Sequence, residues 1–272
     1  MLTISGLYIY PIKSLGGISV DASTVTPRGL QHDRRWMLVD ANNRFLTQRE
    51  FPEMALLQPE FDQDGLRVHH KNFTGISLFI PYTSLPNAPT KNVQVWDDVC
   101  EAQVADNEVN RWFSEVLKRH CQLVYMPETT NRLVDPGQVN SGEITSFSDA
   151  YPILLIGQAS LDDLNSRLAE PLPMNRFRPN IVFRNGEPFE EDRFEEFSIN
   201  TISFFGVKLC SRCVLTTINQ TDVTRGKEPL KTLSTYRTKN NKIYFGQNLL
   251  HSGTGEIKIG DSIEVRKTKD GF

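Results

Sequence analysis

The stretch KLCSRCVLTTI, residues 208–218, contains two cysteines, Cys210 and Cys213, with Arg212 directly before the second. The residues after Cys213 are mostly β-branched or aliphatic, and this pattern predicts a buried strand over 213–218. A cation beside a thiol favours the thiolate, which attacks electrophiles and binds soft metals. The stretch therefore predicts a thiol site at the start of a strand.

A Cys-x-x-Cys pair is compatible with several chemistries. A closed zinc site needs two further ligands, but Cys100 and Cys121 are far apart in the sequence and the five histidines lack finger-like spacing. A thioredoxin-type pair is expected between a strand and a helix, whereas this pair lies between predicted strands. Two buried cysteines that pack as small hydrophobic side chains remain an alternative at this point.

The composition is that of an ordinary globular protein of one large or two smaller domains, with 272 residues of which 23% are charged. The net charge of −3 argues against a general nucleic-acid binder. No apolar run approaches the roughly 18 residues of a membrane span, and the N-terminus lacks the features of a signal peptide. Four cysteines do not make a disulfide scaffold, so we expect a reducing compartment.

The first half of the chain is rich in predicted strands. Short strands separated by Gly, Pro, Asp or Asn follow one another up to residue 104, which predicts a barrel or sandwich. An amphipathic helix follows, with Asp106 as its N-cap and apolar residues at 109, 112, 113, 116 and 117. Residues 126–146 predict a long polar loop. We therefore predict a domain over 1–125 and a second domain over 126–272.

The second half mixes strands and helices. Apolar stretches predict strands, and leucines at 161, 164 and 168 support a helix. The predicted elements are a strand over 151–156, a helix over 159–169, a strand over 180–183, strands over 199–205 and 213–218, a short helix over 227–236, and two strands over 257–265.

Several cations stand beside predicted strand ends, where loops meet and sites form. Each one alone is compatible with a solvated surface charge, and Asp149 is compatible with a simple Asx-turn. Arginine suits phosphate, and a lysine next to a serine can offer a charge and a hydroxyl to an oxyanion. Together they indicate a small anionic ligand in a net acidic protein. The cations, with Ser14 beside the first, are Lys13, Arg34, Arg35, Arg176, Arg178 and Arg212.

Six motifs occur in order along the chain: YPIKS at 10–14, DRRW at 33–36, FRPNI at 177–181, CSRCVLTT at 210–217, KEPLKTL at 227–233 and FGQN at 245–248. With these motifs the chain resembles the MOSC-domain family, in the branch of the mitochondrial amidoxime-reducing component and its bacterial relatives. The resemblance covers essentially the whole chain. It implies a β-rich α+β fold, with an N-terminal MOSC-type β-barrel domain followed by a MOSC β-barrel domain with peripheral helices.

The resemblance also implies a cofactor, the cysteine-ligated molybdenum–molybdopterin known as the molybdenum cofactor. Cys213 would be the metal ligand and the catalytic residue, and Cys210 a bystander. Ala150 and Tyr151 depart from the threonine-serine pair that the family leads us to expect there, so position 150 can offer only backbone contacts. The residues implied to bind the cofactor are Lys13, Ser14, Arg34, Asp149, Arg178, Asn180, Ser211 and Arg212.

The implied activity is reduction of N-hydroxylated compounds: amidoximes, hydroxylamines and N-hydroxylated base analogues. No cysteine follows Cys213, so a four-cysteine iron–sulfur cluster is not expected, and electrons would come from a separate ferredoxin, flavin reductase or cytochrome b5-like protein. We expect a bacterial cytoplasmic protein that binds neither nucleic acid nor membrane. Pyridoxal phosphate binding is a family-level term, although the chain lacks a pyridoxal-phosphate domain.

Two alternatives remain open. In the first, the protein carries the molybdenum cofactor or sulfur without reductase turnover, because MOSC domains also occur in molybdenum-cofactor sulfurases. In the second, it is a metal-free interaction module with inert cysteines. Turnover of an amidoxime separates the first alternative from a reductase, and the metal content of a Cys213→Ala variant separates the second.

Overall fold

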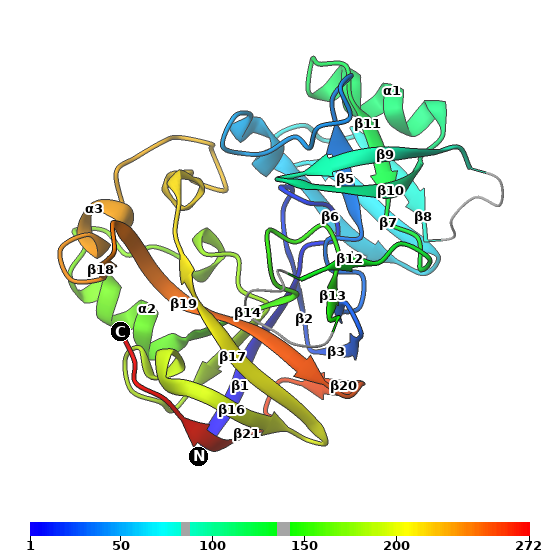
Figure 1. The fold of residues 1–272 in the computed structure, drawn as a ribbon. Helices are drawn as coiled ribbons and strands as arrows, with labels where there is room; N and C mark the ends of the chain where they lie inside the picture. The colour runs from blue at the N-terminus through cyan, green and yellow to red at the C-terminus, as the bar shows by residue number, and fades with distance from the viewer. Residues whose placement is uncertain (83–87, 135–141) are drawn as a thin grey trace.

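The computed structural model describes residues 1–82, 88–134 and 142–272, and most of its regular structure is β-strand. Two lobes are visible in Figure 1. The lower lobe contains both chain termini, and the upper lobe is formed largely by residues from the first half of the chain. The predicted β-rich α+β class is confirmed.

The lower lobe is a closed barrel of seven strands. Strand β19 pairs with both β17 and β14, and this second pairing closes the sheet. Its interior is filled by aliphatic and phenylalanine side chains, as a small barrel requires. In order around the barrel, the strands are β14 (Ile153–Gly157), β15 (Ile181–Arg184), β1 (Leu2–Ile9), β21 (Ser262–Thr268), β16 (Phe194–Ile199), β17 (Ile202–Ser211) and β19 (Lys242–Ser252).

The first strand of the chain belongs to this barrel. In β1, Thr3 lies opposite Arg184 on one side and opposite Ser262 on the other. The next strands extend the same lobe: β2 (Ile18–Val20) pairs with β1, and β3 (Ala22–Thr26) lies between β4 (Gly29–Leu30) and β20 (Gly255–Lys258). The division after residue 125 stays a prediction, but about the first thirty residues pack with the second half of the chain.

The upper lobe is an open half-barrel with a helix. The helix α1 (Asn107–Val116) begins as predicted, because the Asp106 side chain accepts a hydrogen bond from the Val109 N–H at 2.8 Å. Its buried face includes Phe113. One sheet has the order β5 (Trp36–Val39), β11 (Gln122–Tyr125), β10 (Asp98–Val104) and β9 (Thr90–Val95); the other has β6 (Leu57–Asp62), β7 (Gly65–His70) and β8 (Ser77–Pro81).

The predicted strand over 213–218 is wrong. Strand β17 ends at Ser211, and residues Val214–Thr217 form a turn of 3₁₀ helix, η4. The physical reason lies in two threonine hydroxyls: Thr216 Oγ1 donates to the Cys213 carbonyl at 3.0 Å, and Thr217 Oγ1 donates to the Val214 carbonyl at 2.8 Å. Such local hydrogen bonds compete with strand pairing.

Smaller elements complete the described chain. The predicted loop over 126–146 contains a short pair of strands, and the predicted second-half helices are present, the last one shorter than expected. No helix among the described residues is both long and apolar enough to cross a membrane. These elements are β12 (Arg132–Leu133), β13 (Ile144–Thr145), α2 (Gln158–Ser166), α3 (Leu230–Leu233) and β18 (Thr238–Lys239), with 3₁₀ turns η1 (Pro52–Leu56), η2 (Met174–Arg176) and η3 (Glu190–Arg193).

Candidate functional site

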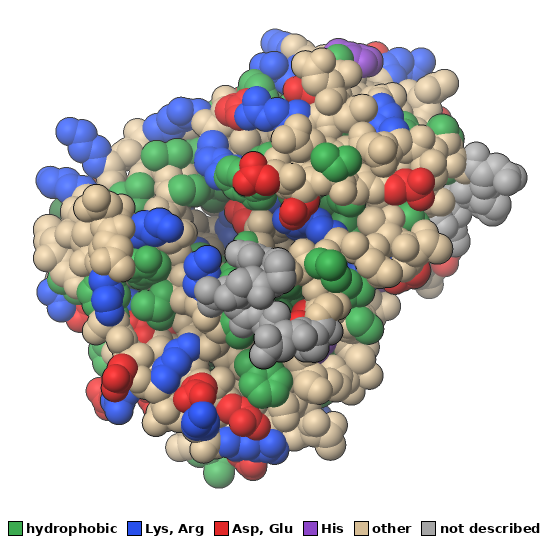
Figure 2. Space-filling model, in the orientation of Figure 1, with side chains coloured by type: hydrophobic (Ala, Val, Ile, Leu, Met, Phe, Trp, Pro, Cys, Tyr) green, Lys and Arg blue, Asp and Glu red, His purple; other side chains and the backbone are tan. Residues whose placement is uncertain are grey.

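A cavity of about 260 Å³ collects loops from both lobes, and Figure 2 shows the surface hollowed between the lobes. Its walls come from the loop after β1, the turn before β5, the loop before β14, the segment before β15 and the end of β17. Every residue predicted to bind a cofactor or metal lines it. These residues are Lys13, Ser14, Arg34, Asp149, Arg178, Asn180, Ser211, Arg212 and Cys213.

The charge of the cavity is strongly positive. Its lining includes one carboxylate, Asp149, and seven cations. The whole chain carries a net charge of −3, so the positive charge is concentrated here. A concave wall of one sign focuses the electrostatic potential and attracts ligands of the opposite sign. The seven cations are Lys13, Arg34, Arg49, Arg176, Arg178, Lys208 and Arg212.

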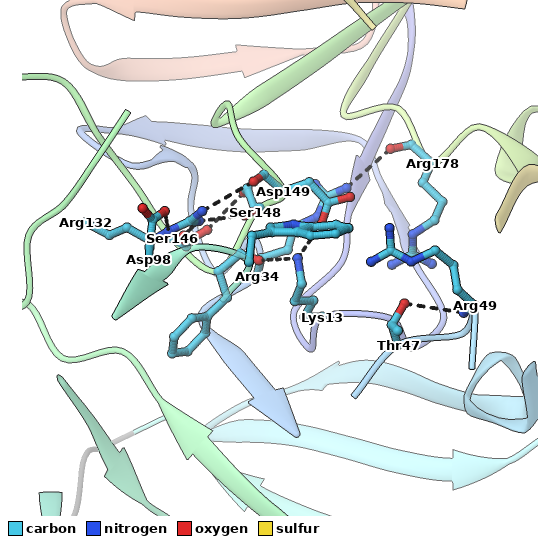
Figure 3. Close-up of polar contacts among 12 residues, drawn as sticks. Lys13, Arg34, Thr47, Arg49, Asp98, Arg132, Ser146, Ser148, Asp149 and Arg178 are labelled. Atoms are coloured by element: carbon cyan, nitrogen blue, oxygen red, sulfur yellow. Dashed lines mark hydrogen bonds and ion pairs between the residues drawn. The ribbon is translucent and has the colours of Figure 1, made fainter. Parts of the chain in front are cut away.

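Lys13 lies in the loop after β1 and lines the cavity. Its Nζ donates to the Phe147 carbonyl at 2.8 Å and to Asp149 Oδ1 at 2.5 Å (Figure 3). Burial lowers the pKa of Lys13 to about 8, although Asp149 opposes this shift. Loss of solvent would raise the pKa of Asp149, but the charge and hydrogen bond of Lys13 outweigh it and hold that pKa below its usual range. The pair therefore places a proton-sensitive cation in the positively charged lining of the cavity.

Arg34 and Arg178 lie on Tyr10, with Cζ atoms 4.4 and 4.2 Å from the centre of its ring. Arg34 Nη1 also donates to Asp33 Oδ2 at 2.5 Å and to Asn180 Oδ1 at 3.0 Å. Both arginines have a positive φ, 49° and 55°, which is costly for a residue with a side chain and is common at functional sites. Burial lowers the pKa of Arg178 to about 10, which still leaves it charged near neutral pH. The two arginines are thus fixed before any ligand arrives.

Cys213 follows the end of β17 and is exposed, whereas Cys210 is half-buried. The sequence predicts that Arg212 supports the Cys213 sulfur, but the structure differs. Arg212 Nη1 donates to Cys210 Sγ at 2.8 Å, and its Nη2 donates to the Phe177 carbonyl at 2.5 Å. Among the described residues no hydrogen bond reaches the Cys213 sulfur. The thiol of Cys213 is therefore open to a ligand in the cavity.

The set of donors fits an anionic molecule that carries its own soft metal. A thiolate is a soft ligand, and the cations match phosphate or other oxyanions. The described residues contain no group of three or more His, Cys, Asp or Glu placed to hold a metal ion. A metal at Cys213 would therefore take its other ligands from the bound molecule. The Nε of Arg212 is buried without a hydrogen-bond partner in the described part of the chain, which suits a further polar contact in this wall.

The sequence did not identify every residue of the lining. Arg49, Lys208 and Asn248 also face the cavity, as does Arg176, which was predicted among the cations for a small anionic ligand but not among the cofactor-binding residues. Arg49 follows a predicted strand as an ordinary polar residue would, so no local pattern marks it. Asn248 lies in the FGQN motif at 245–248, which could have marked it as a candidate.

Comparison with known proteins gives two family matches. Residues 1–120 match the MOSC N-terminal beta barrel domain, and residues 142–264 match the MOSC domain. The mitochondrial amidoxime-reducing component 1 of Homo sapiens is 32% identical over 278 residues, which cover 96% of this chain and 82% of that protein. The mitochondrial amidoxime reducing component 2 of Bos taurus is 30% identical with the same coverage.

A second group of relatives carries a different name. The molybdenum cofactor sulfurase of Oryza sativa subsp. japonica is 32% identical over 265 residues, which cover 89% of this chain. The chain spans only 32% of that protein, so the similarity concerns one part of the sulfurase.

Proposed function

Because the chain belongs to the MOSC-domain family, we propose that it binds the molybdenum cofactor between its lobes and reduces N-hydroxylated compounds. One observation carries the proposal: an exposed thiol and seven cations from both lobes line the same cavity. The relatives named for amidoxime reduction support the reaction class. Amidoximes, hydroxylamines and N-hydroxylated base analogues are the proposed substrates.

The chain's own residues bind and orient the cofactor. Cys213 supplies the thiolate ligand to the metal, and it is the proposed catalytic residue. When bound, the cofactor supplies the two-electron chemistry that removes oxygen from an N–OH group. The proposed cofactor-binding residues come from both halves of the chain: Lys13, Ser14 and Arg34 from the first, and Asp149, Arg178, Asn180, Ser211 and Arg212 from the second.

The electrons come from a separate protein in this proposal. A four-cysteine iron–sulfur cluster needs its thiolates together. Here Cys100 and Cys121 are buried in the upper lobe, and the described residues bring no such group of ligands together. A ferredoxin, a flavin reductase or a cytochrome b5-like carrier would serve as the donor.

A second candidate function follows from the sulfurase relatives. A protein that only carries the molybdenum cofactor or sulfur would use the same cavity and the same exposed thiol. The similarity to the rice sulfurase over 89% of this chain favours keeping this alternative. It differs from the first proposal in one respect, because a carrier has no catalytic turnover.

The test is turnover of benzamidoxime with chemically reduced methyl viologen as electron source. Cofactor-loaded wild type should form benzamidine, while Cys213→Ala should lose at least about 100-fold, since even outer-shell partners of a metal are worth about 10–100-fold. Cys210→Ala is the matched control and should retain most of the rate. Absence of benzamidine from a fully loaded wild type would refute the reductase and favour the carrier.

A further inference from the structure

Arg49 lines the cavity but differs from the other arginines in its surroundings. Its guanidinium group makes no hydrogen bond or ion pair with the residues that the structure describes. Its Cζ lies 4.1 Å from the centre of the Trp96 ring. Figure 3 shows the side chains of Arg49 and Arg178 extending into the same space from different segments. Arg49 therefore has hydrogen-bond donors to offer to a ligand.

Trp96 is held in place as a platform for Arg49. Its Nε1 donates to Asp149 Oδ1 at 3.3 Å, and its ring lies 5.2 Å from the ring of Phe45. Its backbone has a φ of 57°, which is costly for a bulky residue and persists only where the surroundings enforce it. The indole is partly exposed, at 39%, and the half-buried Arg49 that contacts it lines the cavity.

The stacked geometry directs the donors of Arg49. A guanidinium that lies on an aromatic face uses its own face for that contact, so its N–H groups at the edge stay available. These edge donors fit a carboxylate or a phosphate with two parallel hydrogen bonds. The stack also reduces the conformational freedom that binding would otherwise remove. Arg49 is thus pre-oriented for an anionic group.

Five of the other six cations of the wall are already engaged with partners in the described part of the chain, and the exposed Lys208 is the exception. Lys13 donates to Asp149, Arg34 donates to Asp33, and Arg178 Nη1 donates to the Leu15 carbonyl at 2.7 Å. Their fixed positions suit a ligand that stays bound. Arg49 is half-buried and has no such anchor, which suits a ligand that enters and leaves.

Resting on the proposed function, we propose that Arg49, stacked on Trp96, binds an anionic substituent of the substrate. The protein then favours N-hydroxylated compounds that carry a carboxylate or phosphate over neutral compounds with the same reacting group. Arg49 is in this role a specificity-determining residue, and Trp96 is the residue that positions it.

The test is equilibrium binding without an electron donor, so that no turnover occurs. Benzamidoxime and 4-carboxybenzamidoxime are titrated into cofactor-loaded protein by calorimetry. Wild type should bind the carboxylated compound more tightly. Arg49→Gln should weaken binding of the carboxylated compound about tenfold, the usual size of a lost charge-assisted hydrogen bond, and that of benzamidoxime less than about twofold.

Three further variants sharpen the test. Arg49→Lys keeps the charge but loses the planar fork, so it should fall between wild type and Arg49→Gln. Arg111→Gln makes the same charge change on an exposed face of α1 and should leave both affinities unchanged. Lys208→Gln removes a positive charge from the same cavity and should weaken binding of the carboxylated compound clearly less than Arg49→Gln does.

Five results would overturn the proposal. If Arg49→Gln weakened the binding of both compounds equally, Arg49 would not recognise the carboxylate. If Arg49→Gln and Lys208→Gln weakened the binding of the carboxylated compound equally, only a general electrostatic contribution would remain. A loss of bound pterin from purified Arg49→Gln would assign Arg49 to the phosphate of the cofactor instead. A loaded wild type that binds neither compound would overturn the proposed function as well. A loaded wild type that binds benzamidoxime and 4-carboxybenzamidoxime with equal affinity would overturn this inference but not the proposed function.

Discussion

Two walls of the same cavity are built in opposite ways. The inner wall is formed by Arg34, Arg178 and Asn180, which line the cavity, together with Tyr10 and Asp33, which are buried behind them and joined to them by hydrogen bonds and cation–π contacts. The outer wall, the turn over 211–215, is mostly exposed and includes the Cys213 thiol. The difference teaches that the charged groups of this cavity are fixed in position by their partners, whereas the thiol is left accessible.

The inner wall holds charged groups away from water, which costs free energy. Removing a charge from water costs several kcal/mol unless partners compensate it. Here Asp33 accepts from Arg34 and also from the buried Tyr10 N–H at 2.8 Å. These contacts join the loop after β1, the turn before β5 and the segment before β15. The cost is offset by partners that span both halves of the chain, and the result is a rigid cluster of positive charge.

The largest expected effect is the loss of a partner in the inner wall. Asp33→Ala leaves Arg34 without its closest carboxylate and the Tyr10 N–H without its acceptor, so it should lower the free energy of unfolding by about 3 kcal/mol. Val214→Ala changes an exposed residue of the outer wall and should stay within about 0.5 kcal/mol. Urea unfolding measures both. Similar effects of the two substitutions would contradict the contrast between the walls.

A smaller effect should follow from pH through Lys13. Its pKa of about 8 lies below the ordinary lysine value, so the ammonium loses its proton as pH rises through about 8. Retention of an anionic cofactor should therefore be greatest below pH 8 and fall about tenfold by pH 9.5. Considered by itself, Lys13 makes the folded state more stable relative to the unfolded state as pH rises from about 8 toward about 10.4. Over this range the folded chain has lost the Lys13 proton, while the unfolded chain still binds it.

The matched variant for this prediction is Lys13→Arg. Arginine keeps its charge across this range, so the decline in cofactor retention between pH 7 and 9.5 should disappear. Pterin content after incubation at each pH is the measurement. An identical decline in wild type and Lys13→Arg would show that another group controls the pH dependence.

Local patterns in the sequence predicted much of the fold, but not its long-range pairing. The N-cap at Asp106 and the strand-forming pattern of the first residues, where β1 spans Leu2–Ile9, follow from side chains within a few positions. The partner of that strand does not, because Thr3 pairs with Arg184, 181 residues away. The turn after Cys213 was not predicted, because a run of β-branched residues favours a strand. The turn depends on the threonine hydroxyls, which donate to backbone carbonyls three residues earlier in the chain.

The same limit applies to the site. The motifs contain eight of the nine predicted site residues, with Asp149 outside them, and all nine residues line one cavity. They did not predict the contact of Arg212 with Cys210, which depends on where β17 ends. Nor did they mark Arg49 or Trp96, whose proposed roles depend on a contact between segments about fifty residues apart.

The most direct test of the proposed function is the molybdenum and pterin content of wild type, Cys213→Ala and Cys210→Ala, all produced in a host that supplies the cofactor. Near-stoichiometric metal in wild type and Cys210→Ala, with its loss in Cys213→Ala, is the predicted result, because the exposed thiol is the proposed ligand. Pterin retained by Cys213→Ala would assign its binding to the inner wall. Wild type without molybdenum or pterin, despite a loaded host, would contradict the proposal.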